Sequence, residues 1–202
     1  MVWSRGNSLR IGILKGNGQK EVCRVELPRV RAKVPRVLGE AREVQRAARL
    51  IVFIVLSALG AMAKVPGPLG AVTLDAAPSY FAALAFGWGE GALVAGLGSL
   101  LSALISGFPL GVLVHVYAAV QAALWATCLR LAYERGGPVL AMLATIFLAG
   151  VVAAALSWPL GGQALVTSSL APFIVAAAVN VMLAMAAYVF LMRSKVVYVR
   201  RR

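Results

Sequence analysis

Side chains that can do chemistry are few in this sequence, and they are scattered along apolar stretches. The charged residues between 50 and 192 are Lys64, Asp75, Glu90, Arg130, Glu134 and Arg135, and His115 is the single histidine of the chain. An ionised group at membrane depth costs about 2.5–3.5 kcal/mol on insertion scales, so each one is a candidate for function. Any site must therefore be built from a small number of polar groups.

These residues do not form a catalytic or metal-binding pattern. The sequence has no phosphate-binding G-x-x-x-x-G-K-[ST] loop, no H-E-x-x-H and no G-x-S-x-G. Cys23 and Cys128 are too few and too far apart for a metal box or a disulfide framework, and we expect free thiols. We therefore expect no enzymatic activity, no cofactor and no metal.

Five residues form the predicted solute site because they lie at similar depth. Asp75 precedes the second predicted helix by three residues. His115 lies about 7–8 Å, and Asn180 about 12 Å, below the outer ends of their helices at ~1.5 Å per residue. Tyr80 and Trp158 add aromatic rings at comparable depth. Because rings stack against a solute and polar groups orient it, the set predicts an outward-opening pocket for a flat, partly polar solute.

Each of these residues also has a simpler interpretation. Asp75 can cap the N-terminus of the second helix, and Asn180 can tie two helices together. The aromatic rings can belong to a belt at the membrane surface. The sequence leaves both interpretations open.

Small residues form a stripe on the first helix. Ser57, Gly60 and Ala61 lie within five positions of one another. Small residues allow helices to approach closely in lipid. The stripe predicts either internal packing or docking onto another membrane subunit.

The elements that must position these residues are six membrane helices separated by Gly/Pro turns, since about 20 apolar residues cross a bilayer. The predicted ranges are 49–63, 78–87, 90–105, 110–133, 138–156 and 171–192. The second and third are short for a straight crossing. We expect them to tilt, or to have turns that lie inside protein.

Basic residues gather at the two ends of the chain. Residues 1–49 hold twelve Lys or Arg and four Asp or Glu, and residues 193–202 hold five basic residues. Cytoplasmic segments collect Lys and Arg, and an even number of helices returns the chain to its starting side. We expect both termini in the cytoplasm, a membrane domain at 48–193, a basic tail at 194–202 and a disordered basic extension at 1–47. Within that extension, residues 38–49 can form a charged helix leading into the first span.

The amino-acid composition limits the class of protein to which the chain can belong. Hydrophobic residues make up 61% of the chain, above the roughly 45–50% of soluble domains. The positive charge lies in the ends and not on a folded face, so we expect no nucleic-acid partner. The prediction is an all-α, multi-pass protein of the plasma membrane that binds a small solute. Since no ATP-binding motif or inverted repeat is evident, a self-powered transporter is disfavoured and partners must supply energy.

Three strings carry a family resemblance: the first loop KVPGPLGAVTLDAAP, the segment YFAALAFGWGEGALVAGLGSLLSAL, and SGFPLG. With six short helices and cytoplasmic ends, they resemble the substrate-binding S components of energy-coupling-factor (ECF) vitamin transporters. LD-x-AP, FG-x-x-x-GALVAG and SGFPLG are most similar to strings of the α-ribazole S components associated with cobamide (cobalamin) salvage.

The resemblance implies a high-affinity binding subunit that works with an ECF transmembrane coupling protein and two ATPases. It implies docking through an Ala-x-x-x-Ala stripe on the first helix, which here reads Ser57-x-x-x-Ala61. Solute contacts from the first loop and helices four to six map by location onto Asp75, His115, Trp158 and Asn180. Two alternatives remain: a non-transporting assembly or sensor subunit, and a membrane enzyme using Asp75 with His115.

Overall fold

The structure is a computed structural model of the chain, and it describes residues 8–14, 20–26, 36–67 and 70–193. It divides into two compact units, Met1–Val44 and Gln45–Arg202. The predicted tail at 194–202 lies outside the described residues. The second unit holds the helical bundle.

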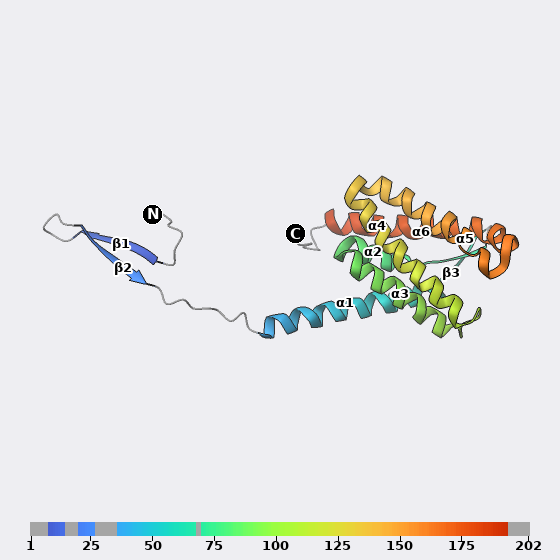
Figure 1. Cartoon of the computed structure of the whole chain (residues 1–202), viewed down its shortest axis with the longest axis horizontal. Helices are drawn as coiled ribbons and strands as arrows, with labels where there is room; N and C mark the ends of the chain where they lie inside the picture. The colour runs from blue at the N-terminus through green and yellow to red at the C-terminus, as the bar shows by residue number, and fades with distance from the viewer. Residues whose placement is uncertain (1–7, 15–19, 27–35, 68–69, 194–202) are drawn as a thin grey trace. The chain divides into compact units, whose positions relative to one another are not determined.

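The first unit contains a β-hairpin. Strands β1 (Ser8–Leu14) and β2 (Lys20–Glu26) pair antiparallel, with Ser8 opposite Glu26 and Leu14 opposite Lys20 (Figure 1). Both strands contain isoleucine or valine, which favour extended backbone. The sequence prediction for 1–47 included no strand. It did include a charged helix near 38–49, and α1 (Arg36–Met62) begins in this unit.

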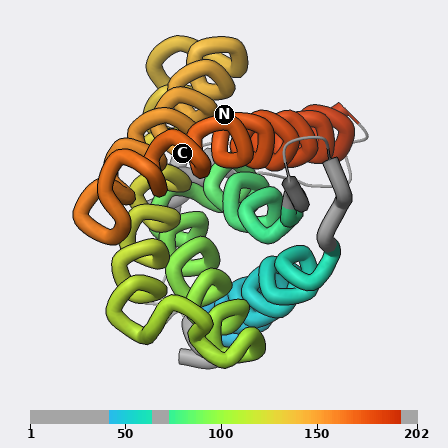
Figure 2. Tube along the Cα trace, turned by 90° about the vertical axis from the view of Figure 1, so that its right-hand side faces the viewer, coloured from blue at the N-terminus to red at the C-terminus, as the bar shows by residue number. Residues whose placement is uncertain are grey.

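The second unit is a bundle of helices. After α1, the helices are α2 (Ala77–Phe86), α3 (Trp88–Ile105), α4 (Val112–Ile146), the π-helix η1 (Phe147–Val152), α5 (Ala153–Ala155) and α6 (Trp158–Arg193). Figure 2 shows the other helices arranged around α2. The core is formed by apolar side chains of α2, α4 and α6, including Leu84, Leu129 and Val181. The predicted helical class is confirmed for this unit.

Four helices among the described residues are long and apolar enough to cross a membrane: Arg42–Met62, Trp88–Ile105, Val112–Ala155 and Trp158–Arg193. The third is interrupted at Gly137 (φ 75°, ψ −169°), directly before Pro138, and the chain turns back there (Figure 1). That break coincides with the predicted boundary between the fourth and fifth helices. Six crossings with cytoplasmic ends stay a prediction.

Helix α2 is too short to cross a bilayer, and its ends are satisfied by other helices. The Ala77 N–H at its first turn donates to Asn180 Oδ1 of α6 at 2.8 Å. The Leu84 carbonyl near its last turn accepts from Arg130 Nη1 of α4 at 2.6 Å. Free backbone groups at a helix end are costly away from water, so these contacts permit a short helix to lie buried within the bundle.

The first loop is more ordered than the sequence suggested. Strands β3 (Lys64–Gly67) and β4 (Gly70–Thr73) pair antiparallel. Valine and threonine favour this extended backbone. The Leu74 N–H then donates to the Gly60 carbonyl at 3.0 Å, which joins the loop to α1. The two short hairpins are additions to the predicted all-helical class.

Candidate functional site

A cavity of about 250 Å³ lies inside the bundle. Its wall comes from the loop before α2 and from α2, α3, α4, η1, α5 and α6. Half of the lining residues are alanines, and the larger or polar ones are Asp75, Ser79, Tyr80, Ser99, Gln121, Trp125, Phe173 and Asn180. Three of the five predicted site residues, Asp75, Tyr80 and Asn180, therefore lie on one cavity wall.

A second cavity, of about 190 Å³, adjoins the first. The two share Ala118, Gln121, Ala153 and Phe173 in their walls. The rest of the second cavity is mainly Leu and Val from the turns and helix ends at 110–114 and 160–165. Gln121 and Phe173 thus lie at the junction of a polar space and an apolar one.

Asn180 is buried, and its amide is used inside the protein. Oδ1 accepts from the Ala77 N–H at 2.8 Å, while Nδ2 donates to the Thr73 carbonyl at 2.8 Å and to the Ala176 carbonyl at 2.9 Å. Both amide hydrogens are engaged. Asn180 forms part of the cavity wall, and its hydrogen bonds fix the end of the first loop and the start of α2.

Asp75 does not cap α2 through its side chain. The N-cap residue is Ala76, which makes no side-chain capping bond. The Asp75 carboxylate accepts from Thr73 Oγ1 at 2.9 Å through Oδ1, and the Asp75 carbonyl accepts from Ser57 Oγ at 2.7 Å. No described residue donates to Oδ2. The carboxylate therefore keeps one oxygen for a solute.

Four further polar groups on the wall have no hydrogen-bond partner among the described residues. They are the Tyr80 hydroxyl, the Ser99 hydroxyl, the Gln121 amide and the Trp125 indole N–H. Tyr80 as a whole is only 4% exposed, and its hydroxyl belongs to the cavity wall. Such groups gain a partner when a solute enters, which is how a largely apolar pocket orients its ligand.

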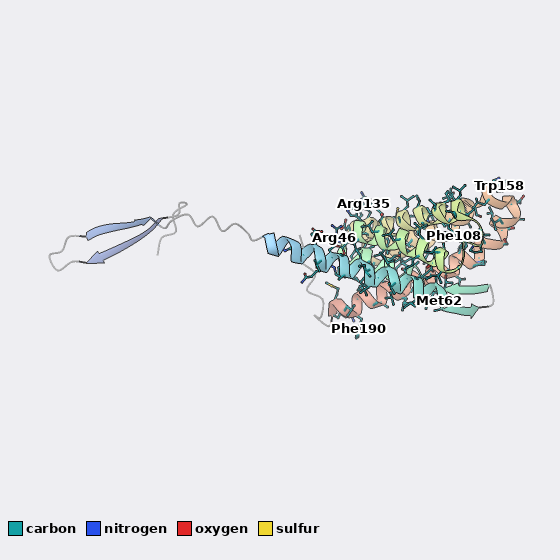
Figure 3. All side chains as sticks on the ribbon, turned by 90° about the horizontal axis from the view of Figure 1, so that it is seen from below. Arg46, Met62, Phe108, Arg135, Trp158 and Phe190 are labelled. Atoms are coloured by element: carbon teal, nitrogen blue, oxygen red, sulfur yellow. The ribbon has the colours of Figure 1, made fainter. Side chains whose placement is uncertain are left out.

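His115 and Trp158 lie outside both cavities, which corrects the prediction based on depth. The turn before α4 is closed by a Schellman motif, in which the Phe108 N–H donates to Ala103 O at 2.9 Å with Gly107 at φ 76°. His115 Nδ1 donates to the Gly111 carbonyl at 2.8 Å, and its ring packs edge-on against Phe108. Trp158 is 57% exposed, at the end of the bundle opposite Arg135 (Figure 3).

The predicted docking stripe is largely internal. Ser57 is buried and packs so closely on α3 that a Cβ at Gly98 would lie 2.7 Å from Ser57 Cβ. A Cβ at Gly60 would likewise lie 2.5 Å from the Leu74 carbonyl oxygen. Gly60 and Ala61 are half-buried. Ser57 and Gly60 therefore serve packing, and the surface that α1 offers to a membrane neighbour is apolar: Ile51, Val52, Val55, Leu59 and Met62.

The sequence analysis missed Ser99, Gln121 and Trp125 as site residues. A signal for one of them was present, because Gln121 is an amide within the apolar run of α4. Trp125 follows it by four positions and so shares its helix face. Among the described residues no group of three His, Cys, Asp or Glu is arranged to hold a metal ion.

The helices and the cavity between them define a class, a multi-pass membrane protein with a solute-sized space in its bundle. Residues 45–193 match the family described as "ECF transporter, substrate-specific component", and the chain belongs to this family. One similar solved structure is described as the S component of a bacterial ECF transporter. It is 18% identical, with a TM-score of 0.63 over 75% of this chain and 98% of that chain, and it supports the fold. A comparison with curated proteins gives no match.

Proposed function

We propose that this chain is the high-affinity binding subunit of an ATP-driven ECF importer for a vitamin or vitamin precursor, α-ribazole. It takes the solute from outside the cell and delivers it by working with an ECF transmembrane coupling protein and two ATPase subunits. Family membership supports the subunit role. The similarity of the LD-x-AP, FG-x-x-x-GALVAG and SGFPLG strings to α-ribazole S components supports the solute.

The observation that carries the proposal is the cavity with unpaired polar groups in its wall. α-Ribazole is a benzimidazole joined to a ribose, so it has both an aromatic ring and several hydroxyls. Asp75 Oδ2 and the Tyr80 hydroxyl can accept hydrogen bonds from sugar hydroxyls. Phe173 offers aromatic surface to a ring.

We further propose six membrane crossings with both ends in the cytoplasm. Arg46, Arg135 and Phe190 lie toward one end of the bundle, and Phe108, Met62 and Trp158 lie toward the other (Figure 3). The first group contains Arg46 of α1 and Arg135, which is close to the break in α4. Helix α6 also ends on this side of the bundle. Because cytoplasmic segments collect Lys and Arg, that end is assigned to the cytoplasm.

The test is equilibrium binding to the purified full chain in detergent or lipid nanodiscs. Isothermal calorimetry with α-ribazole, riboflavin, thiamin and biotin should give submicromolar binding for α-ribazole alone. Tight binding of a different vitamin would keep the importer role and reject the solute. Binding of none of them, by a protein that remains folded, would favour the assembly or sensor alternative.

A further inference from the structure

The two adjoining cavities differ in whether the polar groups in their walls already have hydrogen-bond partners in the protein. Five lining groups of the first cavity lack a protein partner in the described part of the chain: Asp75 Oδ2, Tyr80 OH, Ser99 OH, the Gln121 amide and the Trp125 N–H. In the second cavity every hydroxyl is already engaged. The pairs are Tyr117 with Leu156 O at 3.0 Å, Ser157 with Ala154 O at 2.6 Å and Ser169 with Leu165 O at 2.7 Å.

We propose that the two cavities form one bipartite site, in which the first binds the hydroxyl-rich part of the solute and the second binds its apolar ring. This proposal rests on the proposed function and adds the orientation of the solute and its chemical class. Gln121 and Phe173, which line both cavities, lie where the two parts of the solute join.

Size supports treating the cavities as one site. Separately they measure about 250 and 190 Å³. Each alone falls below the roughly 300–1,000 Å³ typical of ligand sites, whereas the two together fall within that range. The shared wall residues show that the two cavities are adjacent.

Hydrogen-bond chemistry determines which part of the solute binds in which cavity. An ionised carboxylate only accepts and an indole N–H only donates, whereas hydroxyl and amide groups do both. A sugar or polyol can satisfy all of these groups at once. The second cavity offers a hydroxyl-rich group only the Gln121 amide, so a polyol placed there would lose its water without replacement. An apolar ring loses nothing there.

Charge restricts the solute further. Asp75 is the charged residue in the walls of these cavities, and no Lys or Arg among the described residues lines either one. A phosphate brought into this low-dielectric space would meet a carboxylate and no cation. The bipartite site therefore accepts a neutral nucleoside-like solute and rejects its phosphorylated form.

Paired variants test the orientation through separate fragments of the solute. Tyr80→Phe and Ser99→Ala remove hydroxyls from the first cavity, and Val114→Phe fills the second. Matched controls are Tyr133→Phe, which lies outside both cavities, and Ser102→Ala, whose hydroxyl is bonded to Gly98 O. Leu113→Phe matches Val114→Phe, because Leu113 is 85% exposed on the same helix.

The probes are α-ribazole, 5,6-dimethylbenzimidazole as the ring alone, α-ribazole 5′-phosphate, and riboflavin as an unrelated ring–polyol. Calorimetry measures the tight binders, and saturation-transfer NMR measures the ring fragment. Tyr80→Phe and Ser99→Ala should each weaken nucleoside binding about 5- to 30-fold and leave the ring fragment within twofold. Val114→Phe should weaken both by more than tenfold. The phosphate should bind at least 100-fold more weakly than the nucleoside.

These measurements distinguish an error in the bipartite site from an error in the identity of the solute. If riboflavin binds in place of α-ribazole with the same split between variants, the bipartite site stands and α-ribazole is wrong. If α-ribazole binds but Tyr80→Phe weakens the ring fragment as much as the nucleoside, the orientation is wrong and the function stands. Equal binding of the phosphate, or no binding of any ring–polyol, would overturn the bipartite site.

Discussion

At the scale of single residues, Asn180 shows how one amide can organise a site. Its Oδ1 accepts a hydrogen bond from the first N–H of α2, and its Nδ2 donates one to the Thr73 carbonyl at the end of β4. Asn180 therefore joins α6, the first loop and α2. The groups that it holds in place, Asp75 and Tyr80, have polar atoms that remain available to a solute. Asn180 is thus best understood as a positioning residue in the cavity wall.

The first prediction follows from these bonds. Asn180→Leu leaves the Ala77 N–H and the Thr73 carbonyl without their partner, which should cost about 1–3 kcal/mol of stability. Because the loop carrying Asp75 loosens, affinity should fall as well. Thermal unfolding of the ligand-free protein and calorimetric binding measure the two effects on one sample.

A matched control is Thr145→Val. Thr145 is also fully buried, but its hydroxyl bonds only to the Ala141 carbonyl of its own helix. Replacing it by an apolar group of the same shape should change stability and affinity little. If Asn180→Leu instead weakened binding with no loss of stability, Asn180 would be a direct solute contact, as the sequence analysis first predicted.

The limits of sequence reasoning are clearest for the site residues. Position along a helix gave the depth of His115 and Asn180, but it did not give the direction in which each side chain points. His115 turns toward Phe108 and the Gly111 carbonyl, whereas Asn180 turns inward. The partner of Asn180 is 103 residues away in sequence, so no local pattern could reveal it.

At the scale of elements, α2 is unusual because it is short and enclosed. Its residues from Ala77 to Ala85 are buried, and helices α4 and α6 supply the groups that satisfy its two ends. Its boundaries were predictable from Pro78 and Gly87, which suit a helix start and stop. Its central position was not, because it depends on Arg130 and Asn180 reaching it from distant helices.

Helix α1 is attached to the bundle at a few points. Glu90 Oε1 pairs with Arg46 Nε at 3.4 Å and with Arg49 Nη2 at 3.3 Å, and the Arg49 guanidinium lies over the Phe86 ring. Farther along, Ser57 packs against Gly98 of α3. Small residues at this crossing let the two backbones approach.

The second prediction tests this crossing. Gly98→Ala should destabilise the protein by about 1–3 kcal/mol, because the added Cβ would lie 2.7 Å from Ser57 Cβ and would force the helices apart. Gly96→Ala, on the same helix, meets nothing closer than 3.7 Å. Both changes gain the same helix propensity, up to about 1 kcal/mol, so their difference in unfolding temperature isolates packing. Equal stabilities would show that α1 is not held at Gly98.

At the scale of the whole molecule, the arrangement of charge and helices predicts sidedness. A cysteine at Leu160 should react with a membrane-impermeant maleimide added to intact cells, because the break in α6 at Gly161 and Gly162 is assigned to the outer face. A cysteine at Arg135, near the break in α4, should react only after the membrane is opened. The measurement uses a background in which Cys23 and Cys128 are replaced by serine. The reverse pattern would invert the topology, and labelling of both from outside would reject the six crossings.

The central claim is that the chain binds a solute that other subunits then move with ATP. The most direct measurement is the uptake of radiolabelled α-ribazole into proteoliposomes containing the full chain, with or without an ECF coupling protein and its two ATPases. We predict that the chain alone binds the label without accumulating it. The complete assembly with ATP should concentrate the label above the external level. Accumulation by the chain alone, or none by an assembly whose binding subunit holds the solute tightly, would contradict this account.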